Sequence, residues 1–496
     1  MIKRYADSVL TIIFGLLQKY KAWQEVELAV LDARAEAGEI SITDSAAARK
    51  IAEIPIDEEW IDTEEKKVGH DYNAFVAERR RYLPDNRLKR LFHGEMTSYD
   101  GEEPATSLIM KSALDHIIGK VDELERELRI QVRKHRFTPR LERTHGRGAE
   151  VQSLGRFFIT HITPLGQLRQ FIIQARNSFD LSKLSGAIGS GGGLTYEVQR
   201  AALQKLDLTM FDGATQIMPR IFHSQAASAL ADLASWLEKI ALDLWLGSRD
   251  PYPLWEEPFK PTQKGSSAMP WKKNPITLEK VRGLAREARA LASAIRENIV
   301  TPEGRDISQS SVERLAIPDL FHTVSHMLTC LTKVMNGLNV YVDNLTREIV
   351  EMRGTYAGSK AKEMLAEWLE GKLDAETVYR IVQLAGFNAF EPKRAAWFAR
   401  TNGAPQSLDG TDDLLFSMDV VESPPVPHRH FRDIIRHGTL EVSPVLDISE
   451  ETVASWNKTL KELFSDQTKW DEWGEIFNPS YWLKHEQDQF DRVLGK

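Results

Sequence analysis

Apolar residues that recur at three- and four-residue steps constrain the fold of this chain more than any other feature. One run extends from Leu114 to Leu128 and another from Val281 to Ile295, with charged residues between the apolar positions. This spacing places the apolar side chains on one face of an α-helix. Long helices bury such faces against one another, and convincing alternating strand patterns are few. The sequence therefore predicts an all-α fold with a long central helical bundle.

Clusters of glycine, proline and small polar residues divide the chain into three expected parts. These clusters lie near residues 95–105, 186–194, 248–275, 301–306 and 402–428. We predict a helical N-terminal domain over 1–100, a central long-helix bundle over 101–352 and a helical C-terminal domain over 353–496. Within the last part, the proline-rich segment 423–428 predicts an extended surface loop.

Charge and cysteine content exclude several classes of protein. A formal net charge of −8 over 496 residues argues against a general nucleic-acid binder, although an acidic protein can still contain a cationic pocket. Cys330 is the only cysteine, so we expect a buried thiol, no intrachain disulfide and a reducing compartment.

The apolar stretch from Val9 to Leu17 is too short to span a bilayer and continues without a cleavage site into charged sequence. We therefore expect a cytoplasmic protein.

The most distinctive segment is Gly265–Pro275, which reads GSSAMPWKKNP and precedes an expected long helix. Its glycine and serines give a flexible, hydrogen-bonding backbone, and Lys272 and Lys273 lie beside the helix N-terminus. Lysines and helix N-termini both favour anions, so the segment suits closure over a carboxylate. A plain lid or linker would have the same composition, and the residues alone leave both interpretations open.

This segment resembles the signature GSSxMPxKxNP of the fumarase/aspartase superfamily, and within it the chain is most similar to the adenylosuccinate lyase family. Further segments resemble that family in the same order along the chain: Lys3–Tyr5, Ala22–Glu27, Gly69–Phe75, His93–Asp100, Thr144–Gly146, Arg305–Arg314 and Asn478–Tyr481. The resemblance thus spans nearly the whole chain.

The resemblance implies a β-elimination that splits a C–N bond and releases fumarate. The expected reactions are the conversion of adenylosuccinate to AMP and fumarate and the related SAICAR step of purine synthesis. Ser266 would be the base, and its alkoxide would need stabilisation in a closed, dry site because a serine hydroxyl is a poor base. His145 would be the general acid, since imidazole can carry a proton near pH 7. His70 would support acid catalysis or bind phosphate.

The resemblance also implies the substrate contacts and the assembly. The succinyl carboxylates would be held by Thr97, Ser98, Lys272 and Asn274. The phosphate and nucleotide would be bound by Arg4, Tyr5, Arg305, Ser310 and Arg314. The guanidinium forks of the three arginines match oxyanions. Further contacts would come from His93, Thr144 and Gln216. A homotetramer with active sites shared between subunits is expected, without a metal, a cofactor, a nucleic acid or a membrane as partner.

Departures from the family pattern leave the substrate open. They are Gly69 in place of an arginine, Trp271 in place of a histidine, Gly304 in an altered WHER segment, Gln309 in place of a histidine and Ile221 in an altered QRDRH segment. Several of them remove charge at the expected nucleotide end. One alternative is therefore a sister lyase acting on another succinate- or aspartate-derived substrate such as nitrosuccinate. Another is a retired lyase that serves as a structural or binding protein.

Overall fold

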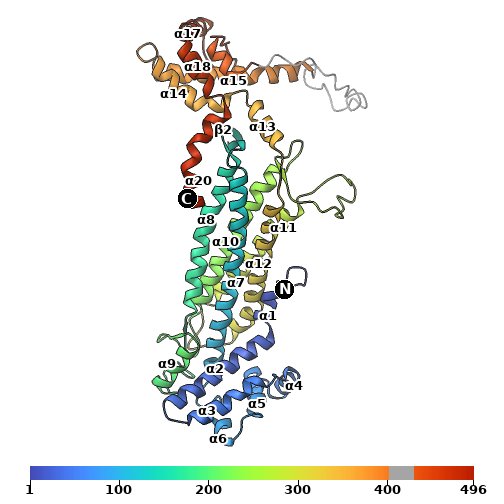
Figure 1. Cartoon of the computed structure of the whole chain (residues 1–496), viewed down its shortest axis with the longest axis vertical. Helices are drawn as coiled ribbons and strands as arrows, with labels where there is room; N and C mark the ends of the chain where they lie inside the picture. The colour runs from blue at the N-terminus through green and yellow to red at the C-terminus, as the bar shows by residue number, and fades with distance from the viewer. Residues whose placement is uncertain (401–428, 496) are drawn as a thin grey trace. The chain divides into compact units, whose positions relative to one another are not determined.

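The computed structural model describes residues 1–400 and 429–495, and it divides into two compact units (Figure 1). The first comprises Met1–Leu128, His161–Arg249 and Trp255–Asn339, and the second comprises Arg129–Thr160, Asp250–Leu254 and Val340–Lys496. The three-domain division stays a prediction, because compactness alone does not test which parts fold independently. The predicted loop over 423–428 lies outside the described residues.

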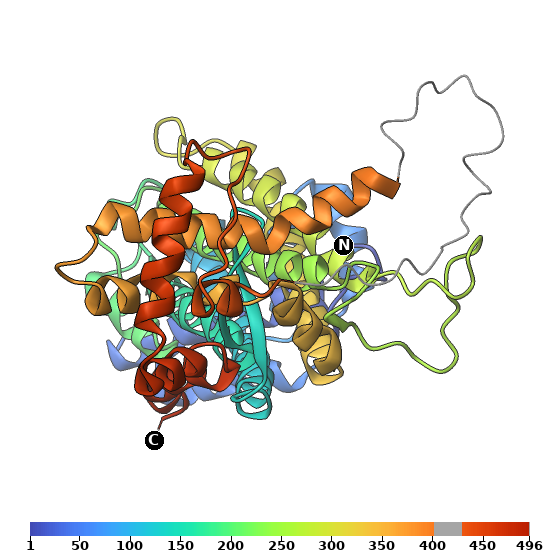
Figure 2. The same ribbon diagram turned by 90° about the horizontal axis from the view of Figure 1, so that it is seen from above.

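Long helices dominate the described residues, among them α7 (Ser98–Lys134), α8 (Leu154–Ser178), α10 (Ile221–Gly247), α11 (Ile276–Glu297) and α12 (Ser308–Asn336). Helices α10, α11 and α12 pack side by side, as the two views of Figures 1 and 2 show. The mostly helical fold class is thereby confirmed. No described helix has an apolar stretch long enough to cross a bilayer.

The apolar stripes of α7 and α11 differ in residue size. On α7 the predicted positions are fully buried from Leu114 to Leu128, apart from half-buried Ile118. On α11 half of the buried residues are alanine, and Leu284 and Leu291 are only half-buried. Small side chains let α11 lie close to its neighbours α10 and α12. Cys330 of α12 is buried, as expected.

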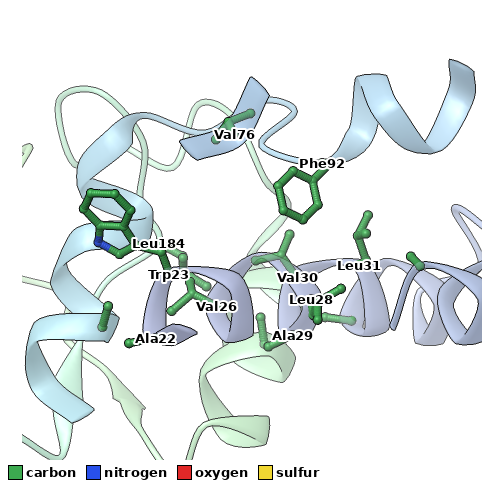
Figure 3. Close-up of a cluster of buried hydrophobic side chains, with 14 of the residues drawn as sticks. Ala22, Trp23, Val26, Leu28, Ala29, Val30, Leu31, Val76, Phe92 and Leu184 are labelled. Carbon is green, nitrogen blue, oxygen red and sulfur yellow. The ribbon is translucent and has the colours of Figure 1, made fainter. Parts of the chain in front are cut away.

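The N-terminal helices form a core around α2 (Leu16–Glu36). Figure 3 shows Val76, Phe92 and Leu184 facing the side chains of α2, among which Trp23 is fully buried. Gly15 is the extended N-cap of α2, so the apolar run at the N-terminus is divided between two helices, and a Cβ on Gly15 would lie 2.9 Å from the carbonyl oxygen of Thr11. The remaining helices of this unit are α1 (Ser8–Ile13), α3 (Ile42–Arg49), η1 (Lys50–Glu53), α4 (Glu58–Val68), α5 (Asp71–Arg80), α6 (Asn86–Leu91) and α9 (Tyr196–Lys205).

Strands are short throughout the described residues. Strand β1 (Pro139–Thr144) pairs antiparallel with β2 (Arg147–Ser153), and β3 (Leu181–Ser182) pairs parallel with β4 (Thr209–Met210). The other two strands are β5 (Trp255–Glu256) and β6 (Asn339–Val340).

The second unit has its own apolar core, in which Phe431 and Trp473 are fully buried. Its helices are α13 (Val342–Glu351), η2 (Thr355–Ala357), α14 (Gly358–Trp368), α15 (Ala375–Arg400), α16 (Phe431–Arg436), α17 (Glu450–Leu463), α18 (Gln467–Glu475), α19 (Pro479–Leu483), η3 (Lys484–Glu486) and α20 (Gln487–Leu494).

Candidate active site

The loop between β5 and α11, residues 257–275, carries Ser266 and is called the signature loop below. In Figure 1 it projects from the helices of its unit. The Met269 N–H donates to Ser266 Oγ at 3.3 Å, and the Ser266 N–H donates to the Lys272 carbonyl at 3.3 Å. A Cβ on Gly265 would lie 2.1 Å from the Pro270 carbonyl oxygen, so this fold of the loop requires glycine. The loop thus joins Ser266 to Lys272 and directs one N–H donor at the serine oxygen.

The N-terminus of α11 is occupied by a carboxylate of the chain itself. Both oxygens of Glu257 accept from the Thr277 N–H at 3.1 Å, and one accepts from the Leu278 N–H at 3.2 Å. Burial raises the pKa of Glu257, and these hydrogen bonds oppose that rise. The Thr277 and Leu278 N–H groups are thus bonded to a carboxylate of the chain itself, and the predicted carboxylate contacts of Lys272 and Asn274 stay predictions. Exposed Lys272 and half-buried Asn274 remain as the nearby polar side chains.

Ser98 is the first residue of α7 and Thr97 precedes it, and a buried ion pair fixes this start of the helix. The Thr97 N–H donates to Asp100 Oδ2 at 2.9 Å, and Lys183 Nζ lies 2.8 Å from Asp100 Oδ1. Neither side chain of this pair is exposed to solvent. Asp100 also accepts from the Gly186 N–H at 3.1 Å. A fully hydrogen-bonded buried pair of this kind fixes the start of the helix.

His93 is held by a buried carboxylate. Its Nδ1 and its backbone N–H each lie 2.8 Å from an oxygen of Glu27, which also accepts from the Tyr72 hydroxyl at 2.7 Å. Because a carboxylate oxygen accepts, Nδ1 carries a hydrogen and donates to Glu27. The sequence interpretation assigned no role to Glu27 or Tyr72. The available signal was an acidic residue directly before the apolar run 28–31.

His70 and Arg314 are brought together by Asp71. His70 caps the N-terminus of α5, with its Nδ1 3.7 Å from Asp71 Oδ1. Asp71 Oδ2 lies 2.9 Å from Arg314 Nη2 and 3.5 Å from Lys19 Nζ. Burial raises the pKa of Asp71, but Lys19, the Tyr72 N–H and Arg314 outweigh it, so the pKa lies below its usual value. The sequence interpretation missed both Asp71 and Lys19.

Arg305 and Gln216 also meet, although 89 positions separate them in the chain. Arg305 Nη1 donates to Gln216 Oε1 at 2.8 Å, and the guanidinium carbon lies 3.9 Å from the ring centre of Tyr99. Ser310 is half-buried in the first turn of α12. At the N-terminus Arg4 is exposed, while the ring of Tyr5 lies 4.9 Å from that of His326.

Thr144 and His145 belong to the second unit, at the turn of the β1–β2 hairpin. Thr144 pairs with Arg147, and φ is +52° at His145 and +73° at Gly146. Two consecutive positive φ values are typical of a type I′ turn, which explains the glycine of the motif. His145 is exposed on this turn. Beside it, Arg143 is bound to Glu348 at 2.5 and 3.0 Å.

Known proteins match this chain in sequence. The model of a lyase family matches residues 8–289. Adenylosuccinate lyase from Aquifex aeolicus is 33% identical over 395 residues, which cover 79% of this chain and 89% of that protein. Adenylosuccinate lyase from Streptococcus mutans is 28% identical over 493 residues, or 99% of each chain.

Solved structures match the fold. Fumarate lyase from Mesorhizobium sp. BNC1 has a TM-score of 0.76 at 19% identity, over 100% of this chain and 99% of the other. β-Carboxy-cis,cis-muconate cycloisomerase from Acinetobacter calcoaceticus sp. ADP1 has a TM-score of 0.74 at 20% identity, over 99% and 98%. At this level of identity, the likeness concerns the fold alone.

Proposed function

The chain belongs to the lyase family of the fumarase/aspartase superfamily, and we propose that it is an adenylosuccinate lyase that splits adenylosuccinate into AMP and fumarate. The observation that carries the substrate proposal is Arg305. Its partners in the described part of the chain are a neutral amide and a neutral ring, so its positive charge is available to a ligand phosphate. Identity of 33% to an adenylosuccinate lyase supports the same substrate.

In the proposed reaction, Ser266 removes a proton from the carbon beside a succinyl carboxylate. The negative charge that develops spreads into that carboxylate, which Thr97, Ser98, Lys272 and Asn274 hold. The N–H of Met269, 3.3 Å from Ser266 Oγ, supports this role because a donor there stabilises an alkoxide. Closure of the signature loop would exclude water and so strengthen the carboxylate contacts and the hydrogen bond to Ser266.

The leaving nitrogen takes its proton from His145 in this proposal. An imidazole at the tip of a tight hairpin turn is accessible to a substrate, which supports the assignment. We further propose that the protein is a homotetramer with shared active sites, in which this turn serves a site of another copy. His70 would then orient the phosphate end together with Arg314 and Arg4.

A fumarate-release assay with purified protein and adenylosuccinate tests the proposed function. We expect turnover that Ser266→Ala abolishes, and the adjacent variant Ser267→Ala provides the matched control. Sedimentation of the same preparation tests the tetramer, and a monomer with full activity would contradict the shared sites. Fumarate release from another substrate, with none from adenylosuccinate, would contradict the nucleotide assignment.

A second candidate is a sister lyase that acts on another succinate- or aspartate-derived substrate such as nitrosuccinate. It is favoured by Gly69, which ends α4 in a left-handed conformation with φ +70° where the family pattern has an arginine. The site therefore lacks one cation next to His70. A panel of succinyl-type substrates compared by kcat/KM separates the two lyases. Turnover of any of them would exclude a purely structural role.

A further inference from the structure

The guanidinium of Arg305 is held by two residues from other parts of the first unit. Tyr99, in the first turn of α7, places its ring 3.9 Å from the guanidinium carbon. Gln216, in the segment before α10, accepts from Nη1 at 2.8 Å. The backbone on either side is joined as well, since Thr215 Oγ1 donates to the Gly304 carbonyl at 2.7 Å. Arg305 is therefore fixed on one face and at one nitrogen.

This arrangement leaves the other edge of the guanidinium without a partner. Arg305 Nε is buried and has no hydrogen-bond partner among the described residues. The Tyr99 ring covers one face, and the N–H groups of Nε and Nη2 lie side by side in the plane of the guanidinium. Two parallel N–H donors in that plane match two oxygens of a phosphate or a carboxylate. The ligand chemistry indicated is an oxyanion that accepts both hydrogen bonds.

A buried arginine fixes the three segments that form this arrangement. Arg220 Nη1 lies 2.7 Å from Glu103 of α7 and 2.8 Å from the Met218 carbonyl. Its Nε lies 2.7 Å from Glu313 of α12. The start of α7, the segment that carries Gln216 and the start of α12 are thus tied to one side chain. Tyr99 consequently has little freedom to leave Arg305.

The phenol of Tyr99 is suited to a stacking role. Burial raises the pKa of Tyr99, and Arg305 opposes that rise only in part. The ring is therefore neutral near pH 7 and attracts the cation through its π face. A neutral ring orients Arg305 without neutralising it, whereas a carboxylate at this position would compete with a ligand anion.

We propose that Tyr99 is a positioning residue that sets the preference of this site for phosphate monoesters by holding Arg305 with its free edge toward the ligand. The inference rests on the proposed function in one respect, which is that Arg305 contacts the substrate phosphate. It adds a residue to which the sequence interpretation gave no role.

The test measures binding of AMP, adenosine and inorganic phosphate by calorimetry to the wild type, Tyr99→Leu and Tyr99→Phe. Loss of the ring should weaken AMP binding by about 3- to 30-fold, the range of a cation–π contact, while Phe should stay within about twofold of the wild type. Adenosine binding should not respond to Tyr99→Leu. With adenylosuccinate as substrate, KM should rise in Tyr99→Leu while kcat stays unchanged.

Two controls separate positioning from general damage. Tyr196→Leu makes the same change at an exposed tyrosine in α9 and should leave AMP binding unaltered. In the Arg305→Ala background, Tyr99→Leu should add no further loss, because its effect passes through Arg305. If Tyr99→Leu lowers the melting temperature, Tyr99→Met fills the space without a π face and replaces it.

Several results would overturn the proposal. Unchanged AMP affinity in Tyr99→Leu, equal losses for Leu and Phe, or an additional loss in the Arg305→Ala background would each do so, as would a wild type that binds neither AMP nor inorganic phosphate. A wild type that binds AMP but does not split adenylosuccinate contradicts the proposed function alone. In that case the Tyr99 variants still decide the positioning role.

Discussion

The first turn of α7 and the signature loop hold their proposed site residues in opposite ways. Thr97 and Ser98 lie at the start of a helix that is fixed by Asp100 and Lys183, neither of which is exposed to solvent. In the signature loop, Ser266 is held through hydrogen bonds to its own loop, and Lys272 is exposed. The first region is built to keep its geometry, and the second is held by a few local contacts.

This difference matches the two tasks of the proposed reaction. Residues that bind carboxylates act best when their geometry is set before the ligand arrives, and a buried ion pair provides that at the cost of desolvation. The base must reach the substrate and then be covered, which requires a segment with few stabilising contacts. Substitutions in the signature loop should therefore alter catalysis, while substitutions of the ion pair at the start of α7 should alter stability.

The largest effect is expected for Ser266→Ala, which removes the oxygen proposed as the base. We expect kcat to fall by about 10⁴-fold or more, with KM and the melting temperature close to the wild type. Steady-state kinetics and thermal unfolding measure both parts. Ser267→Ala is the control, and an inactive Ser267→Ala beside an active Ser266→Ala would transfer the role to the neighbouring serine.

His145→Gln should slow elimination by about 10²–10⁴-fold, the usual contribution of a positioned proton donor. The loss should shrink for a leaving group that needs no proton, such as nitrite, if such a substrate is accepted. His70→Gln is the comparison, since a residue that binds phosphate should mainly raise KM. Equal losses for His145→Gln on both substrates would indicate that His145 orients the substrate instead.

Lys183→Met should show the opposite pattern, because it leaves Asp100 buried without its cation. We expect a loss of about 3–5 kcal/mol in the free energy of unfolding. Urea denaturation measures it, and the double variant with Asp100→Leu should recover part of the loss. A loss below about 1 kcal/mol in the single variant would mean that this pair does not fix the start of α7.

Gly265→Ala is expected to have the smallest overall effect, with a moderate loss of rate and little change in stability. The added Cβ would meet the Pro270 carbonyl oxygen at 2.1 Å, so the loop must shift and displace Ser266. We expect kcat to fall by about 10- to 100-fold, while the free energy of unfolding changes by less than about 1 kcal/mol. Gly283→Ala, at an open position of α11, is the matched control. A large loss of stability in Gly265→Ala would remove the contrast between the two regions.

The sequence by itself determined the helices and the local turn of one proposed site segment. The apolar period of Leu114–Leu128 predicted α7 and its buried face, since a helix places residues three and four apart on one side. Gly146 of the segment Thr144–Gly146 accords with the positive φ of the hairpin turn. These features depend on neighbours within a few positions, which a local pattern can express.

Only the tertiary structure decided which side chains meet. Glu27 holds His93 across 66 positions, Asp71 holds Arg314 across 243, and Gln216 holds Arg305 across 89. The occupation of the α11 N-terminus by Glu257 was equally absent from the pattern. Hydrogen bonds act over about 3 Å, so they depend on how distant segments pack, and a periodic spacing fixes only which face each segment buries.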